Sequence, residues 1–338
     1  MVIEPIEPRS QPPRLTILVE TINSVEYEQT GIESPNTIGE LIAALEHQNG
    51  PERVELLLMV DSRDEASAGR EAGSLDEHPD QSDPAGSRCS IRQIPVEHAT
   101  YFEMKNRGAQ IATTQYVAFL DDDCLPGADW LTTSLAALDS GADAVIGRTR
   151  YRGPGVWARI MDCLDWGDVR ATASGSAACL LPNNSAFRRE AFLRYPWDTR
   201  HRRSGGCMAP YLRMMADGMQ VVYAPEMSAA HGNNYRELWG FAHRLRNGHD
   251  TAMILRNDDQ GIVPHRWLLR LGPAGGIVLA LGRIWGDLKR LTRHFGDFGI
   301  SRPAVPLVWL VMAPMRLIEG AAYALSCVRP DVIGQRWG

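Results

Sequence analysis

Apolar and polar positions along the first 150 residues alternate in blocks that have the lengths of strands and helices. Short apolar runs rich in β-branched residues predict strands at 15–19, 54–61, 89–96, 116–120 and 144–151. Thr37 with Glu40, and Thr100 with Glu103, have the spacing of a capping box. Each pair therefore predicts the start of a helix, and Gly50 is expected to close the first of them.

The order of these elements predicts the fold class. Strands that alternate with helices favour an α/β fold, with a mainly parallel sheet covered by helices. In such sheets, ligands bind beyond the carboxyl ends of the strands. Three predicted strands end in polar residues, at Glu20-Thr21, at Asp61 and at Asp121 to Asp123. We therefore expect a ligand site where these strand ends converge.

Three adjacent aspartates, Asp121 to Asp123, follow a buried strand directly. Carboxylates this close repel one another and lose hydration beside a core. One interpretation is a turn, in which Asp is common. The other is a hard divalent cation on Asp121 and Asp123, which would also bind substrate phosphate oxygens. A calcium loop of the EF-hand type is excluded, because Leu125-Pro126 occupy later ligand positions.

The composition is that of a globular protein. The chain has 338 residues, 44% of them hydrophobic and 22% charged, which allows one large or two modest domains. Six cysteines without a C-x-x-C pair fit reduced thiols in the cytoplasm better than a disulfide or zinc framework. The proline-rich, acidic N-terminus has no apolar segment of the kind found in signal peptides.

The charge is unevenly distributed. From Gly261 onward there are ten Lys/Arg against four Asp/Glu, whereas the preceding part has 25 against 37. An acidic body argues against nucleic-acid binding, and the basic C-terminal part suggests an anionic partner.

The most apolar segments, 269–285 and 304–328, also lie in the C-terminal part. The stretch 304–315 is shorter than the roughly 20 residues of a spanning helix, and Pro306 and Pro314 are expected to interrupt it. Arg316 and Glu319 are spaced to pair on a helix. These features favour an interfacial position on an anionic membrane surface. A marginal spanning hairpin and a soluble helical subdomain are the alternatives.

The motifs between residues 15 and 231 resemble those of bacterial family 2 glycosyltransferases, which have the GT-A fold. "ILVETIN" and "LLMVDS" are similar to the first two strands of the family. "EMKNRGAQIATTQYVAFLDDDCLPGADWL" resembles its A-R-N-x-G helix and D-x-D strand end, with Lys105, Asn106 and Gly108 in the helix. "PNNSAFRREAF", after an expected apolar strand "AACLLP", resembles the N-x-A-F-R-R segment, and "GMQVVYAPEMSAAHG" a late strand closed by His231.

The resemblance implies sugar transfer with inversion from a nucleotide-diphosphate donor, with Mn²⁺ or Mg²⁺ as cofactor. It implies that Asp121, Asp123 and His231 hold the metal, although a structural role is an alternative for His231. A strand-end turn is an alternative for Asp61, and a solvated helix face for Lys105. The residues expected to bind the nucleotide sugar are Thr21, Asp61, Lys105, Asn106, Asp121, Asp122, Asn184, Arg188, Arg244 and Arg246.

One family motif is missing. The Glu-Asp pair that supplies the catalytic base aligns with Gly206 and Cys207, and a thiol is mostly protonated at neutral pH. The candidates for the base are therefore Asp198, His201 and Cys207. The same gap leaves a non-catalytic binding or scaffold protein as an alternative function. A sugar nucleotidyltransferase is disfavoured, because the loop "ETINSVEYEQTG" is acidic and nearly free of glycine.

The expected organisation is a flexible tail over 1–13, a GT-A domain over 14–235 and a basic, membrane-associated helical region over 236–338. Within the GT-A domain we expect a mobile insertion at 62–88. The expected reaction is metal-dependent transfer to a hydroxyl of a glycan or lipid-linked acceptor. We expect it to occur in the cytoplasm at the inner face of the cell membrane, with no nucleic-acid partner.

Overall fold

The computed structural model of the chain describes residues 12–21, 37–61, 87–97, 99–153, 155–170, 177–201, 205–232 and 237–337. The predicted tail and the predicted insertion lie outside these residues, except for 12–13 and 87–88.

A mixed sheet forms the centre of the described structure. Its strand order is β3 (Cys89–Val96), β2 (Val54–Asp61), β1 (Leu15–Glu20), β4 (Tyr116–Asp121), β7 (Asn184–Arg188), β6 (Ala144–Tyr151), β8 (Val221–His231) and β5 (Cys124–Pro126). The first four strands run parallel, β7 is antiparallel to β4 and β6, and β5 is antiparallel to β8. This arrangement confirms the predicted α/β class, and the five predicted strands are present.

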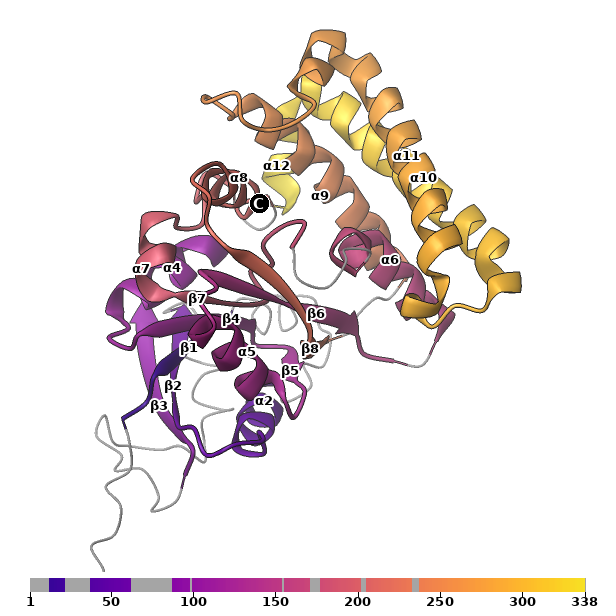
Figure 1. Ribbon diagram of the computed structural model, residues 1–338. Helices are drawn as coiled ribbons and strands as arrows, with labels where there is room; N and C mark the ends of the chain where they lie inside the picture. The colour runs from indigo at the N-terminus through magenta and orange to yellow at the C-terminus, as the bar shows by residue number, and fades with distance from the viewer. Residues whose placement is uncertain are drawn as a thin grey trace, which may run out of the picture.

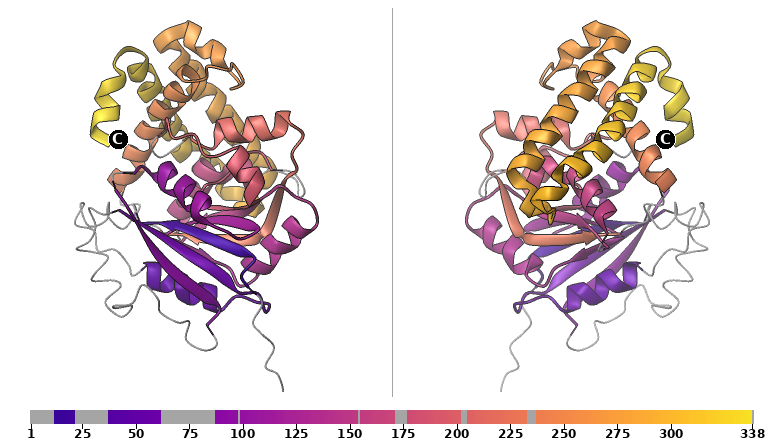
Figure 2. Two further views of the ribbon diagram at one scale, coloured as in Figure 1. Left: turned by 90° about the vertical axis from the view of Figure 1, so that its left-hand side faces the viewer. Right: turned by 90° about the vertical axis from the view of Figure 1, so that its right-hand side faces the viewer.

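Helices cover both faces of the sheet (Figures 1 and 2). On one face, α2 (Thr37–Glu46) and α5 (Trp130–Asp139) pack over a buried apolar cluster. On the other face, α4 (Tyr101–Ile111), α6 (Val156–Arg170), α7 (Arg189–Arg194) and α8 (Met208–Ala216) pack over a second cluster. Strands buried on both faces explain why the apolar runs in the sequence are nearly continuous.

The start of α4 shows why the sequence folds as it does here. The Thr100 amide donates a 2.8 Å hydrogen bond to the Glu103 carboxylate, which completes the predicted capping box. Gly108 lets this helix lie close to β1, because a Cβ there would come within 2.7 Å of Leu18. The helix is thus fixed both at its start and along its length, which positions its polar face at the sheet edge.

Residues 177–182, which we predicted to form a strand, have no regular secondary structure. The strand begins at Asn184 instead, where β7 inserts between β4 and β6. The apolar side chains of Leu180 and Leu181 are buried in the core without strand pairing, so hydrophobicity alone gave the wrong boundary.

The C-terminal part is helical. It contains α9 (Glu237–Arg256), the 3₁₀ segment η2 (Arg266–Ala274), α10 (Gly275–His294), the 3₁₀ turns η3 (Phe295–Phe298) and η4 (Arg302–Ala304), α11 (Val305–Val328) and α12 (Pro330–Trp337). Figure 1 shows α10 and α11 side by side, on the side of the sheet where α6 lies. We call these two helices the α10–α11 hairpin. They approach closely at two glycines: a Cβ on Gly276 would lie 2.2 Å from the Gly320 carbonyl oxygen.

The expected interruption by proline in this region is wrong. Pro306 lies in the first turn of α11, where a missing N–H costs nothing, and the helix continues through Pro314. By length and composition, Arg266–Phe298 and Arg302–Val328 are each sufficient to cross a membrane. The prediction that the second segment is too short is therefore also wrong, and the test by length does not separate spanning from interfacial helices.

A buried ionic network joins these helices. Glu319 of α11 accepts hydrogen bonds from Arg244 at 3.0 Å and from Arg283 at 2.7 Å, and it pairs with Arg316 as predicted, at 3.0 Å. Arg316 also contacts Asp287 of α10 at 2.8 Å. Arg244 pairs in addition with Asp165 of α6, so the network ties the hairpin to the sheet domain.

Candidate active site

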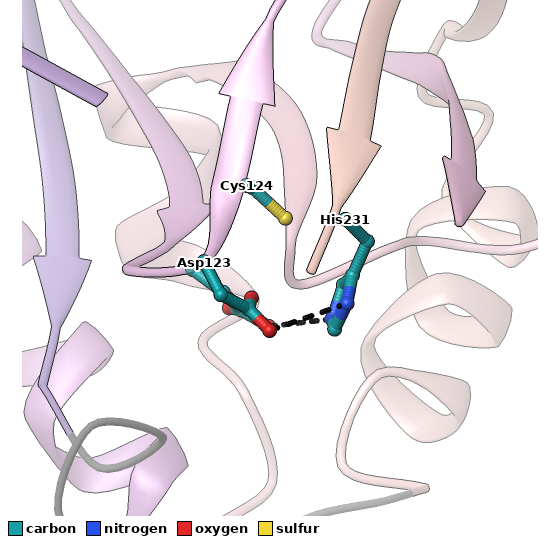
Figure 3. Close-up of side chains that lie close together, drawn as sticks. Asp123, Cys124 and His231 are labelled. Carbon is teal, nitrogen blue, oxygen red and sulfur yellow. Dashed lines mark ion pairs between the residues drawn. The ribbon is translucent and has the colours of Figure 1, made fainter. Parts of the chain in front are cut away.

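A turn after β4 and the pairing of β5 with β8 bring four possible metal ligands together. After β4 the chain turns through Asp122 and Asp123 into β5, and Cys124 of β5 pairs with His231 of β8. One ligand atom from each of Asp121, Asp123, Cys124 and His231 lies within 4.8 Å of the others. Figure 3 shows Asp123, Cys124 and His231 from these neighbouring strands.

His231 lies between the two carboxylates. Its Nδ1 is 3.4 Å from Asp123 Oδ2, and its Nε2 is 3.8 Å from Asp121 Oδ2. Burial alone would lower the pKa of His231, but Asp123 and Asp121 raise it to about 9. Gly232 has to be small, because a Cβ there would lie 2.8 Å from Asp123 Oδ2. The site thus concentrates negative charge that a divalent cation would compensate.

The donor set fits the predicted divalent metal. Two carboxylates and an imidazole are ligands that Mn²⁺ accepts readily. Cys124 contributes less, because Mn²⁺ and Mg²⁺ prefer carboxylate ligands to the soft sulfur of a thiolate. Asp121, Asp123 and His231 therefore remain the candidate ligands.

Lys105 and Tyr101 of α4 both donate hydrogen bonds to Asp121. Lys105 Nζ donates to Asp121 Oδ1 at 2.8 Å, and the Tyr101 hydroxyl donates to the same oxygen at 2.7 Å. Burial would raise the pKa of Asp121, but Lys105 and His231 hold it well below its ordinary value. Lys105 is fully buried and also 3.8 Å from Glu20. It is therefore not on a solvated helix face, and the structure places it as a support of Asp121.

Asn106 connects α4 to the segment that carries the candidate bases. Its Nδ2 donates to the Trp197 carbonyl at 2.9 Å, and the Trp197 amide donates to its Oδ1 at 3.1 Å. Trp197 itself is buried against Phe119 and Phe187. The structure therefore uses Asn106 to fix the position of the next residue, Asp198.

Asp198 and His201 line one cavity of about 310 Å³ between this segment and the end of α9. Asp198 is ion-paired to Arg200 at 2.7 Å, and this pairing outweighs burial and lowers its pKa. Burial lowers the pKa of His201, which keeps the imidazole neutral at neutral pH. Burial raises the pKa of Cys207 to about 11, so its thiol stays protonated and the structure argues against Cys207 as a base.

Comparison with known proteins decides the family. Residues 32–195 match the family described as "Glycosyl transferase family 2". The chain carries a family 2 glycosyltransferase domain. The predicted resemblance to this family is thus confirmed, and the matched residues include β4 with its aspartates and the α4 helix that supports them.

The GT-A fold of this glycosyltransferase domain is also found among solved structures. The mannosyltransferase PcManGT from Pyrobaculum calidifontis, in complex with GDP-Man and Mn²⁺, aligns with a TM-score of 0.57 at 17% identity, over 95% of this chain and 88% of that one. The S. aureus protein TarS aligns with a TM-score of 0.44 at 11% identity, over 93% and 55%. At these identities the first likeness shows the fold alone, and the second carries no argument. No curated protein matches the chain in sequence.

Three predicted donor ligands lie at the strand ends of the glycosyltransferase domain. Thr21 follows β1, and its hydroxyl is buried without a hydrogen-bond partner in the described part of the chain. Asp61 ends β2 and Asp122 follows β4, and both are buried. Their places agree with a site beyond the strand ends, and their contacts with a donor stay predictions.

Three other predicted ligands are used by the fold instead. Asn184 binds the Trp130 indole at 2.8 Å and the Met227 carbonyl at 3.1 Å, on the opposite face from Lys105. Arg188 pairs in register with Tyr116, at the far end of β4 from Asp121. It donates to the Leu138 carbonyl in the last turn of α5 and to the Ala142 carbonyl after that helix.

Arg244 is fully buried in the ionic network with Asp165 and Glu319. Its guanidinium is therefore used in the network between α6, α9 and α11, and its contact with the donor stays a prediction. Arg246, two residues further along α9, is only partly buried, and its contact with the donor stays a prediction.

Sequence reasoning missed the residues that surround the metal ligands. Arg152 donates to the Asp123 carbonyl at 3.4 Å and pairs with Glu40 at 2.8 Å. The rings of Tyr151 and Trp166 have their centroids 5.4 Å and 5.6 Å from that of His231. These contacts join elements that are distant in sequence, so no local sequence pattern predicts them. Tyr101 is different, because its spacing of four residues before Lys105 on one helix face was a usable signal.

Proposed function

We propose that the chain is a metal-dependent inverting glycosyltransferase that moves a sugar from a nucleotide-diphosphate donor to a hydroxyl acceptor. The observation that carries the proposal is the group of Asp121, Asp123 and His231 within 4.8 Å, at the strand ends of a family 2 glycosyltransferase domain. The aligned mannosyltransferase, which has the same fold, was solved with GDP-Man and Mn²⁺.

Different residues would bind the metal and the nucleotide-sugar donor. Asp121, Asp123 and His231 would hold a divalent cation, with Mn²⁺ or Mg²⁺ as the proposed metal. The cation would supply positive charge to the diphosphate as it leaves. Lys105 and Tyr101 keep Asp121 ionised and correctly oriented, since both donate to its Oδ1. We assign Thr21, Asp61 and Asp122 to the nucleoside side of the donor.

Inversion requires a base on the face of the sugar opposite the diphosphate. Asp198 and His201 are the two candidates, because both face one cavity and Asn106 fixes the chain beside them. His201 has the neutral form that a base needs, whereas the Asp198 carboxylate is occupied by Arg200. A binding protein without turnover is the second candidate function, and it is favoured by the Gly206-Cys207 pair in place of Glu-Asp.

We also propose that the enzyme works on an anionic membrane surface, at the cytoplasmic face, with a lipid-linked or glycan acceptor. Ile277, Leu281 and Trp285 are spaced four residues apart on one face of α10, and they are 65%, 58% and 68% exposed. On α11, Leu307 and Leu310 are 65% and 60% exposed. The opposite faces of both helices carry the buried ionic network, which supports an interfacial rather than a spanning position.

Calorimetric titration with GDP and with UDP, in the presence and absence of Mn²⁺, tests the donor site. We expect one of the two nucleotides to bind with a requirement for Mn²⁺, and Asp123→Asn to weaken this binding at least tenfold. Asp331→Asn, on the surface of α12, is the matched control and should bind as the wild type does. Unchanged affinity in Asp123→Asn would refute the metal assignment.

A further inference from the structure

Two arginines on β6, Arg148 and Arg150, lie close to α6. They follow the register shift that separates Gly147 from Arg148 in the pairing of β6 with β8. Arg150 interacts electrostatically with Arg148 and with Asp162 and Arg159 of α6, so these charged groups form one cluster.

Arg148 and Arg150 have no paired acid in the part of the chain that the structure describes. Neither Arg148 nor Arg150 forms a hydrogen bond or ion pair with any residue in the described ranges, and the Nε of each is buried without an acceptor. A guanidinium presents five N–H donors, and a buried donor left unsatisfied is unfavourable. A surface arginine would keep its Nε hydrated, so simple solvation does not explain this pair.

The surroundings add positive charge. Burial, then Arg148, and also Arg159, lower the pKa of Arg150. Asp162 is the nearby acid, but it already accepts a 2.7 Å hydrogen bond from the Tyr151 amide and pairs with Arg159 at 3.5 Å. The cluster of Arg148, Arg150 and Arg159 is therefore short of negative charge, which an anionic ligand would supply.

The cluster lies between the metal ligands and the C-terminal helices. Arg150 pairs in register with Ala230 of β8, the residue before His231. In the other direction, Arg159 Nε is 3.8 Å from the position that a Cβ on Gly299 would take. Gly299 lies in the turn that joins α10 to α11. The cluster thus extends from the neighbour of His231 to the turn of the α10–α11 hairpin.

We propose that Arg148 and Arg150 form a binding site for a phosphate group on the acceptor. Arginine suits phosphate, because its planar fork makes two parallel charge-assisted hydrogen bonds to phosphate oxygens. The donor diphosphate has its own partner in the metal at Asp121 and Asp123. The assignment of the phosphate to the acceptor rests on the proposed function, whereas the anion site itself rests on the arginines alone.

The anion site is tested by calorimetric titration of the full chain with inorganic phosphate in EDTA, so that no metal contributes. The wild type should show saturable binding at one site. Arg148→Gln combined with Arg150→Gln should weaken it at least tenfold. Arg194→Gln, on the exposed surface of α7, should not change it. Circular dichroism of the double variant verifies that it is folded. No binding by the wild type, or equal binding by the folded double variant, would overturn the site.

A second titration identifies which substrate carries the phosphate. It repeats the first with the donor site saturated by GDP or UDP and Mg²⁺. Retained phosphate binding supports the acceptor assignment, whereas displacement by the nucleotide would show that the arginines serve the donor diphosphate and would overturn it. If neither nucleotide binds, the proposed donor site fails, and the first titration still decides whether the arginines bind phosphate.

Discussion

Replacement of the exposed apolar residues Ile277, Leu281 and Trp285 by serine should release the protein from membranes. Full burial of a large apolar side chain is worth about 1.5–3 kcal/mol. These three side chains are 65%, 58% and 68% exposed, so their transfer into the interface would contribute about 3–6 kcal/mol in total. Each 1.4 kcal/mol is a factor of ten, and the partition coefficient should therefore fall about 10²- to 10⁴-fold.

The assay is co-sedimentation with liposomes that contain anionic lipid, at low salt. Wild-type binding should also weaken as salt is added, because surface charge attraction is screened over about 10 Å at 0.1 M. Met215→Ser, at a 45% exposed position on α8, is the matched control and should sediment normally. Thermal unfolding without lipid should change little, since the substituted side chains are on the surface. A triple variant that sediments like the wild type would refute the membrane face.

Three further predictions follow from single contacts. Glu319→Gln removes the carboxylate that Arg244, Arg283 and Arg316 share, and urea unfolding should show a loss of about 3–5 kcal/mol; a loss below about 1 kcal/mol would show that the network is not stabilising. Thr21→Val should raise the donor KM with no loss in thermal stability, because the hydroxyl has no partner in the described part of the chain; an unchanged KM would remove Thr21 from the site. If His201 is the base, His201→Gln should cost about 10²- to 10⁴-fold in kcat, and kcat/KM should fall only as pH drops below about 6.5, because burial lowers its pKa. A pH profile that is flat down to about pH 4 would assign the base to Asp198, whose pKa is also lowered.

Local patterns predicted the parts of the fold that local interactions determine. The capping box at Thr100 and the strand at Val54–Asp61 are where the sequence placed them, because caps and strands buried on both faces leave a direct pattern. Residues 177–182 show the limit of this reasoning. Their apolar side chains enter the core without strand pairing, and hydrophobicity does not distinguish the two situations.

The site was predictable to the extent that it is formed by strand ends. The aspartates and His231 have a pattern of polar residues after apolar runs, and the structure brings them together. Arginine roles were not predictable, because the same residue type serves as an ion-pair partner in the core at Arg244 and, among the residues that the structure describes, as a cation without an acid partner at Arg150. Only the tertiary contacts decide between these roles.

Metal-dependent sugar transfer is tested by the release of nucleoside diphosphate from GDP-mannose and from a panel of UDP-sugars, measured with Mn²⁺ and again in EDTA. We expect the wild type to release nucleotide from one donor class only with the metal present, and Asp123→Asn to abolish this release. Release that continues in EDTA and in Asp123→Asn would contradict the metal-dependent mechanism. Metal-dependent nucleotide binding with no release from any donor would show that the chain is a binding protein and not an enzyme.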